Sequence, residues 1–189
     1  MSGVQKHWIS AQDLLEDALR LAARVRESGF RPDVIIGLWR GGAPVAVAVH
    51  EALRFHGIDA AHMPVVTRLY SGIDRRAGEL LIEGLERLQP ILAMPSRILL
   101  VDDVWDTGIT LSGVREGIAA LPGAAREIRS ATVWFKPTRN LTQNAPDYRV
   151  HESDDWLVFP HELEGLGIAE QREHRGEEFV RALMGQRSD

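Results

Sequence analysis

Two adjacent carboxylates and a short hydroxyl-rich loop are the part of the chain best suited to chemistry. Asp102 and Asp103 follow four consecutive apolar residues, and the loop of residues 106–110 begins three positions later. Ionised carboxylates only accept hydrogen bonds, which suits the hydroxyl groups of a sugar such as ribose. Gly108 lets the backbone approach an anion, and a loop that enters a helix offers free N–H groups to a phosphate. The pattern therefore predicts a site for a sugar phosphate.

The elements that must position these residues can be read from the apolar pattern. Residues 34–38 and 98–101 are uninterrupted apolar runs, typical of strands buried on both faces of a parallel sheet. Residues 64–66, 128–136 and 146–150 also have strand patterns, whereas residues 14–28, 45–55, 80–92 and 111–121 have helical spacing. This alternation predicts an α/β fold, in which ligands bind at the carboxyl ends of the strands.

Residues 98–110 resemble the phosphoribosyl pyrophosphate (PRPP) signature of type I phosphoribosyltransferases: four apolar residues, two acids, two spacers, then Asp-Thr-Gly-x-Thr. The resemblance implies the fold of that family, a parallel twisted sheet flanked by helices with a small hood. It also implies that Asp102 and Asp103 hold the ribose hydroxyls, directly or through Mg²⁺ and water. The loop that receives the 5′-phosphate would consist of Asp106, Thr107, Gly108, Ile109 and Thr110.

A second anion site is predicted at the end of the 34–38 strand. Arg40 supplies a permanent cation, and Gly41 and Gly42 expose backbone N–H groups ahead of a helix. In the resembled family an Arg-Gly-Gly loop at this point receives the pyrophosphate of PRPP. We therefore expect both anion sites to serve one substrate.

The base would be bound by residues from the second half of the chain. Lys136 ends a predicted strand, where an ammonium group can donate to a carbonyl oxygen. Its family counterpart contacts the exocyclic oxygen of a 6-oxopurine. Residues 156–162 resemble the purine-binding hood of the same enzymes, which implies that Trp156 stacks on the base and that Leu157 and Glu162 also line its site. Some relatives carry an acid where this chain has Val158, a departure that weakens the case for guanine or xanthine.

The resemblance also assigns the reaction and its lid. It implies transfer of phosphoribose from PRPP to hypoxanthine, or to guanine or xanthine, in purine salvage, with Asp106 accepting the proton of the purine ring. Tyr70 and Ser71 begin the segment that would close over the reacting centre and exclude water. Two alternatives remain open: a regulatory protein that binds PRPP, and a phosphoribosyltransferase for adenine or a pyrimidine.

Composition bounds the remaining possibilities. At 189 residues we expect one domain, with a core at residues 30–140, a hood at 146–168 and a C-terminal helix at 169–185. The net charge of −5 argues against a nucleic-acid partner, and the lack of cysteine excludes disulfides and thiolate metal sites. No stretch is typical of a signal peptide or a membrane span, so we expect a cytoplasmic protein. Six positions separate His50 from His56, which does not fit a helical zinc site and predicts surface residues. Homodimers are common in the resembled family, and no residue pattern demonstrates one here.

Overall fold

A computed structural model describes residues 6–69, 80–93, 96–123 and 126–185 of the chain. It divides into two compact units, which we describe separately. The larger unit runs from Leu15 to Asp154, and the smaller unit combines the two chain ends, up to Leu14 and from Asp155 onward.

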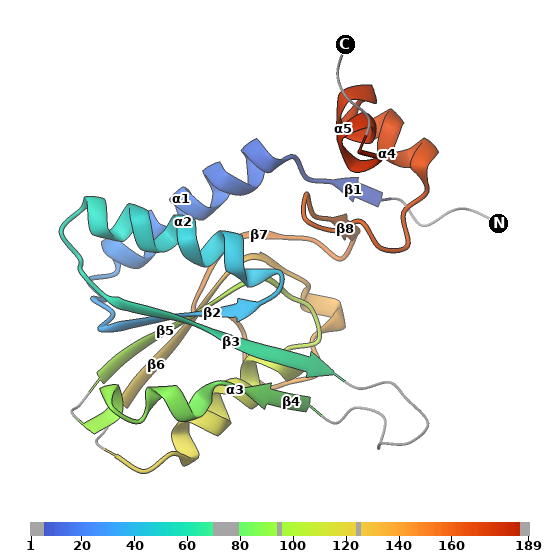
Figure 1. Ribbon diagram of the computed structural model, residues 1–189. Coiled ribbons are helices and arrows are strands. Elements are labelled where there is room, and N and C mark those ends of the chain that lie inside the picture. The colour runs from blue at the N-terminus through green and yellow to red at the C-terminus, as the bar shows by residue number, and fades with distance from the viewer. Residues whose placement is uncertain (1–5, 70–79, 94–95, 124–125, 186–189) are drawn as a thin grey trace. The chain divides into compact units, whose positions relative to one another are not determined.

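A six-stranded sheet in the order β4-β3-β2-β5-β6-β7 forms the larger unit (Figure 1). Its strands are β2 (Val34–Trp39), β3 (Ala61–Leu69), β4 (Leu80–Glu83), β5 (Ser96–Trp105), β6 (Arg126–Phe135) and β7 (Tyr148–Glu152). All neighbouring strands pair in parallel except β4, which is antiparallel to β3. Parallel pairing brings the carboxyl ends of β2, β5 and β6 to one edge of the sheet.

Helices cover both faces of this sheet. Helices α1 (Ala11–Glu27) and α2 (Gly42–Phe55) lie over one face, and α3 (Ile109–Ala120) lies over the other (Figure 1). On the α3 side, Ile36 of β2 and Leu100 of β5 are fully buried in one cluster with apolar residues of α3. The side chains on the other face of these strands, including Ile35 and Leu99, are also buried. Burial on both faces explains the unbroken apolar runs in the sequence.

The smaller unit contains a second, two-stranded sheet. Strand β1 (Lys6–Trp8) pairs in parallel with β8 (Trp156–Val158), and Ile9 N donates to Val158 O at 3.0 Å. Two short helices follow, α4 (Ile168–Arg175) and α5 (Glu177–Leu183). The two ends of the chain thus build one unit around β8.

Several expectations about individual elements are wrong. Residues 80–92 are not a helix but strand β4 followed by two 3₁₀ turns, Leu85–Leu88 and Ile91–Ala93. The helix expected at 169–185 is two helices separated at Gly176, whose φ is 89°. Residues 148–152 were expected to lie within the hood, but they form β7 of the central sheet.

The two histidines considered for zinc differ in environment. His56 is exposed as expected, whereas His50 is buried, with Nε2 3.2 Å from Ala60 O and its ring 4.4 Å from that of His62. His50 is therefore a packed residue of α2 rather than a surface one. Across the ranges described above, no helix is long and apolar enough to cross a membrane.

Candidate active site

The predicted Arg-Gly-Gly loop meets the acid pair at the carboxyl edge of the larger sheet. A Cβ atom added to Gly41 would overlap the carboxylate of Asp103. One added to Gly42 would lie 2.6 Å from Val101 O and 2.7 Å from Asp102 Oδ1. Only glycine allows the loop after β2 to approach the acids of β5 this closely. The structure therefore joins motifs that lie sixty positions apart in the chain.

The acid pair is held by the backbone around it. Asp103 N donates to Asp102 Oδ1 at 3.0 Å, and Val104 N donates to Asp103 Oδ1 at 2.8 Å. The N–H of Gly42 also donates to the Asp102 carboxylate. Burial raises the pKa of Asp102 well above its usual value, and the negative charge of Asp103 raises it further. A bound cation or hydrogen-bond donor would favour the ionised form and offset both effects.

The loop of residues 106–110 turns from β5 into α3, as expected. Gly108 has a φ of 80° and precedes the first residue of α3. A Cβ atom there would lie 2.5 Å from Trp105 Nε1 and 2.7 Å from Asn140 Oδ1, so glycine is required both by conformation and by space. Thr107 Oγ1 accepts from Ile109 N at 3.4 Å, and the first turn of α3 carries no acidic residue. The helix N-terminus is therefore suited to an anion.

A cluster of one acid and two bases lies at the end of β5 and β6. Lys136 is buried, and its Nζ lies 4.0 Å from Asp106 Oδ2. Arg139 Nε lies 2.6 Å from Asp106 Oδ1, within ion-pair distance, although no N–H of the described residues is aligned for a hydrogen bond with that oxygen. Lys136 N donates to Trp105 O at 2.9 Å, which fixes the residue beside the loop. The sequence predicted Asp106 and Lys136 separately, and the structure brings them together.

The end of β2 carries two exposed side chains. Arg40 is exposed after the last residue of the strand, and Trp39 before it is 51% exposed, with a cis peptide bond between the two. Sequence reasoning identified Arg40 but not Trp39 or Arg139. The only sequence signal for Trp39 was an aromatic residue directly before the Arg-Gly-Gly loop, and Arg139 lies three positions after Lys136.

The predicted base-binding residues other than Lys136 belong to the smaller unit. Trp156 is 53% exposed on β8, Leu157 is buried, and Glu162 is exposed with Oε2 accepting from Phe159 N at 3.2 Å. The predicted lid residues Tyr70 and Ser71 lie outside the described residues.

Comparison with known proteins identifies the family. The model of the phosphoribosyl transferase domain matches residues 9–165. The chain belongs to the phosphoribosyltransferase family. A purine phosphoribosyltransferase from Pyrococcus horikoshii Ot3 is 30% identical, with 86% of this chain and 97% of that chain covered and a TM-score of 0.65. No curated protein sequence matches the chain.

Two further solved structures share the fold at lower identity. One is a hypothetical protein from Neisseria gonorrhoeae with bound ppGpp, 18% identical, with 92% of this chain and 97% of that chain covered and a TM-score of 0.69. The other is the xanthine-guanine-hypoxanthine phosphoribosyltransferase of Helicobacter pylori, 19% identical, with coverages of 82% and 92% and a TM-score of 0.60. The expected fold class is confirmed, and the chain is an enzyme of the pentosyltransferase class.

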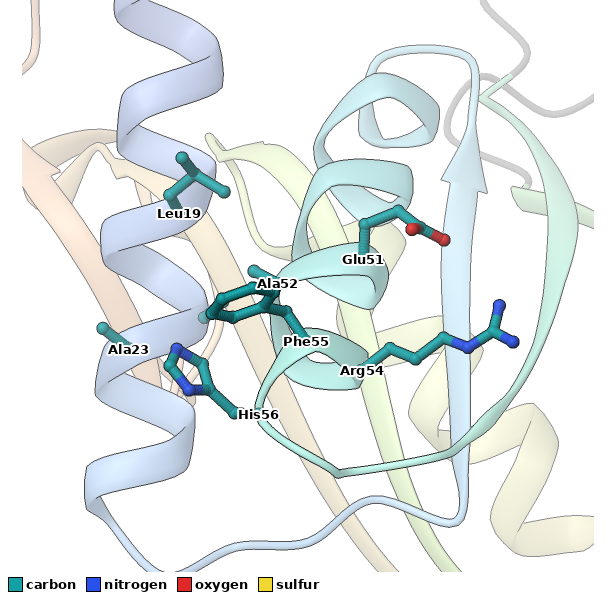
Figure 2. Close-up of a pocket in the computed structure, with 8 residues that line it drawn as sticks. Leu19, Ala23, Glu51, Ala52, Arg54, Phe55 and His56 are labelled. Atoms are coloured by element: carbon teal, nitrogen blue, oxygen red, sulfur yellow. The ribbon is translucent and has the colours of Figure 1, made fainter.

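The phosphoribosyltransferase also has a pocket that is separate from this site. It has a volume of about 680 Å³ and lies between α1 and the last turns of α2, where Leu19, Ala23, Ala52 and Phe55 surround it (Figure 2). None of the residues predicted to bind substrate lines it. The candidate site is instead an open edge of the sheet, assembled from the ends of β2, β5 and β6.

Proposed function

We propose that this phosphoribosyltransferase transfers phosphoribose from PRPP to a 6-oxopurine in cytoplasmic purine salvage. Hypoxanthine is the first candidate, followed by guanine and xanthine. The products are the nucleoside 5′-monophosphate and pyrophosphate. The observation that carries the proposal is the packing of Gly41 and Gly42 against Asp102 and Asp103. It brings the loop that we propose for pyrophosphate against the acids that we propose for ribose.

PRPP would be bound by residues of three neighbouring elements. The backbone N–H groups of residues 107–110 and the hydroxyl groups of Thr107 and Thr110 suit the 5′-phosphate. The carboxylates of Asp102 and Asp103 suit the ribose hydroxyls. Arg40 and the backbone of Gly41 and Gly42 suit the pyrophosphate.

Magnesium fits this arrangement as a companion of PRPP. Mg²⁺ keeps several waters and is usually held by one or two carboxylates together with substrate phosphates. Asp102 and Asp103 offer two carboxylates, and no group of three or more acidic or histidine side chains in the described part of the chain could hold a metal. These two residues would therefore hold Mg²⁺ through water and PRPP. The bound ion would spread the negative charge of the departing pyrophosphate.

The buried ammonium group of Lys136 supports a 6-oxopurine as the acceptor. An ammonium group donates to a carbonyl oxygen, whereas the amino group of adenine is itself a donor. The 30% identity to a purine phosphoribosyltransferase supports the same class of base. Trp156, exposed on β8, offers a ring face for stacking, and Leu157 and Glu162 belong to the same segment.

In the proposed reaction a purine ring nitrogen forms a bond to C1′ of the ribose while the bond from C1′ to pyrophosphate breaks. The pyrophosphate leaves with the bonding electrons, and the proton of the purine ring passes to Asp106. Arg139 lies against Oδ1 of that carboxylate, so Oδ2, 4.0 Å from Lys136, is the oxygen we assign as proton acceptor. The positive charge of Lys136 holds the Asp106 carboxylate near the base, and Lys136 also recognises that base.

Nucleotide formation from PRPP and Mg²⁺ tests the proposal, with hypoxanthine, guanine, xanthine, adenine and orotate assayed side by side. Turnover of hypoxanthine, with guanine or xanthine slower, is the expected result. Turnover confined to adenine or orotate would keep the PRPP site and refute the assignment of the base. Tight PRPP binding without turnover of any base would favour a regulatory protein instead.

A further inference from the structure

The turn that follows β8 is held by one side chain of helix α4. Arg175 Nη2 donates to Phe159 O and to Glu162 O, each at 2.9 Å, and Nη1 donates to Pro160 O at 3.1 Å. Hydrogen bonds from a guanidinium group are charge-assisted, and its planar shape fixes their directions. One side chain therefore holds three carbonyl groups of residues 159–162.

Arg175 is itself confined by aromatic rings of the smaller unit. It is the last residue of α4, and its guanidinium carbon lies 5.3 Å from the centre of the Trp8 ring and 5.0 Å from that of Phe179. Burial lowers the pKa of Arg175, and the charge of Glu162 opposes that effect. A guanidinium group can stack on rings and donate in its own plane at the same time, which an ammonium group cannot do.

Glu162 closes the same turn from its own side chain. Its Oε2 accepts from Phe159 N at 3.2 Å, and Glu162 N donates to Phe159 O at 3.0 Å. Phe159 is buried, at 2% exposure, so the turn is anchored directly after Val158, the last residue of β8. The position of β8 is thus coupled to the contacts that Arg175 makes.

We propose that Arg175 is the positioning residue of the base-binding segment. By holding residues 159–162, it sets where β8 presents Trp156 and Leu157 to the base. This inference rests on the proposed function, because the role of β8 in binding a purine is itself part of that proposal. The residues assigned to PRPP belong to the larger unit, so loss of Arg175 should weaken binding of the base and spare that of PRPP.

The experiment compares Arg175→Met and Arg175→Lys with the wild-type enzyme. Steady-state kinetics would give KM for hypoxanthine and for PRPP, and hydrogen exchange would follow peptides covering residues 156–162. Arg172→Met is the matched control. Arg172 lies on the same helix and its side chain pairs with Glu177 at 2.5 Å, and within the described part of the chain that side chain makes no hydrogen bond with residues 159–162. It removes the same charge without touching the carbonyl groups.

For Arg175→Met we expect KM for hypoxanthine to rise about tenfold or more, KM for PRPP to change less than about twofold, and exchange at residues 156–162 to accelerate. Arg175→Lys should keep the charge and show most of the same defect, and it carries the test if the methionine variant does not fold. Unchanged exchange, or an unchanged KM for hypoxanthine, would overturn the proposed role of Arg175 and leave the proposed function standing. A wild-type enzyme that turns over no purine would overturn the proposed function, and this inference with it.

Discussion

Replacing Gly42 with alanine tests whether the contact between the Arg-Gly-Gly loop and the acid pair is needed. The new Cβ atom would lie 2.6 Å from Val101 O, 2.7 Å from Asp102 Oδ1 and 2.8 Å from Asp102 Cα. Two of these atoms are backbone of β5, a strand paired on both sides, so neither can move without disturbing the sheet. The loop must therefore move away from the acids by several tenths of an ångström.

The cost follows from this overlap. Overpacking of this kind costs about 1–3 kcal/mol in the free energy of unfolding. For a chain of this length each kcal/mol lowers Tm by roughly 2–4 °C, so we expect a fall of about 2–12 °C. Displacement of a substrate-binding loop by up to about 1 Å can lower the reaction rate by as much as 10²-fold. We therefore expect weaker PRPP binding together with the lower Tm.

Gly117→Ala is the matched control for this measurement. A Cβ atom there would lie 2.8 Å from Leu85 Cδ1, the end of a flexible side chain, and Gly117 lies inside helix α3, where alanine is favoured over glycine by about 1 kcal/mol. Differential scanning fluorimetry and PRPP titration calorimetry would follow both variants. If Gly42→Ala matched Gly117→Ala in both Tm and PRPP affinity, the argument from close packing would be refuted.

Three further predictions concern single side chains. Asp106→Asn should reduce turnover by roughly 10²–10⁴-fold and leave PRPP affinity nearly unchanged, since a general base is lost, and unchanged turnover would remove Asp106 from that role. Asp102→Asn should raise Tm more at neutral pH than near pH 4. Because the folded pKa of Asp102 is raised, the folded state keeps a proton at pH values where the unfolded state has released it. The free energy of unfolding of the wild-type protein therefore falls as pH rises from the ordinary carboxyl pKa toward the raised one. An equal gain in Tm at both pH values would contradict this. Gln171→Met should raise the free energy of unfolding by about 1–3 kcal/mol in urea titrations, because both amide atoms of Gln171 are buried and neither has a hydrogen-bond partner among the described residues. A lower free energy of unfolding would show that the amide has a partner.

The central strand, its loop and the following helix could be predicted because their signals are local. An uninterrupted apolar run of this length is typical of a strand buried on both faces, and Gly108 lies where the chain needs a positive φ. The pairing of Asp106 with Arg139 could not be predicted in the same way. It depends on the register of β5 with β6, which places Trp105 opposite Phe135 and so brings two separate loops together.

Leucine spacing misled the prediction at residues 80–92. Leu81, Leu85 and Leu88 fit a helical face, but Gly84, with a φ of 101°, interrupts the backbone between them. The residues before it pair with β3 instead, a contact between segments separated by the predicted lid. Gly176 divides the C-terminal segment in a similar way, because its φ of 89° ends α4 before α5 begins. In both places one glycine conformation outweighed an amphipathic pattern.

The acid pair gives a physical reason to regard the carboxyl edge of the sheet as a binding site rather than a structural feature. A partly buried, desolvated carboxylate beside a second one destabilises the folded protein when ionised, and a neutral amide could accept the same N–H groups from Gly42 and Asp103. Stability alone would therefore favour asparagine at position 102. Carboxylates at both positions are useful only if something positive or hydrogen-bond donating arrives from solution. The ribose hydroxyls of PRPP and its accompanying Mg²⁺ meet that requirement, so we expect PRPP with Mg²⁺ to stabilise the wild-type enzyme more than Asp102→Asn.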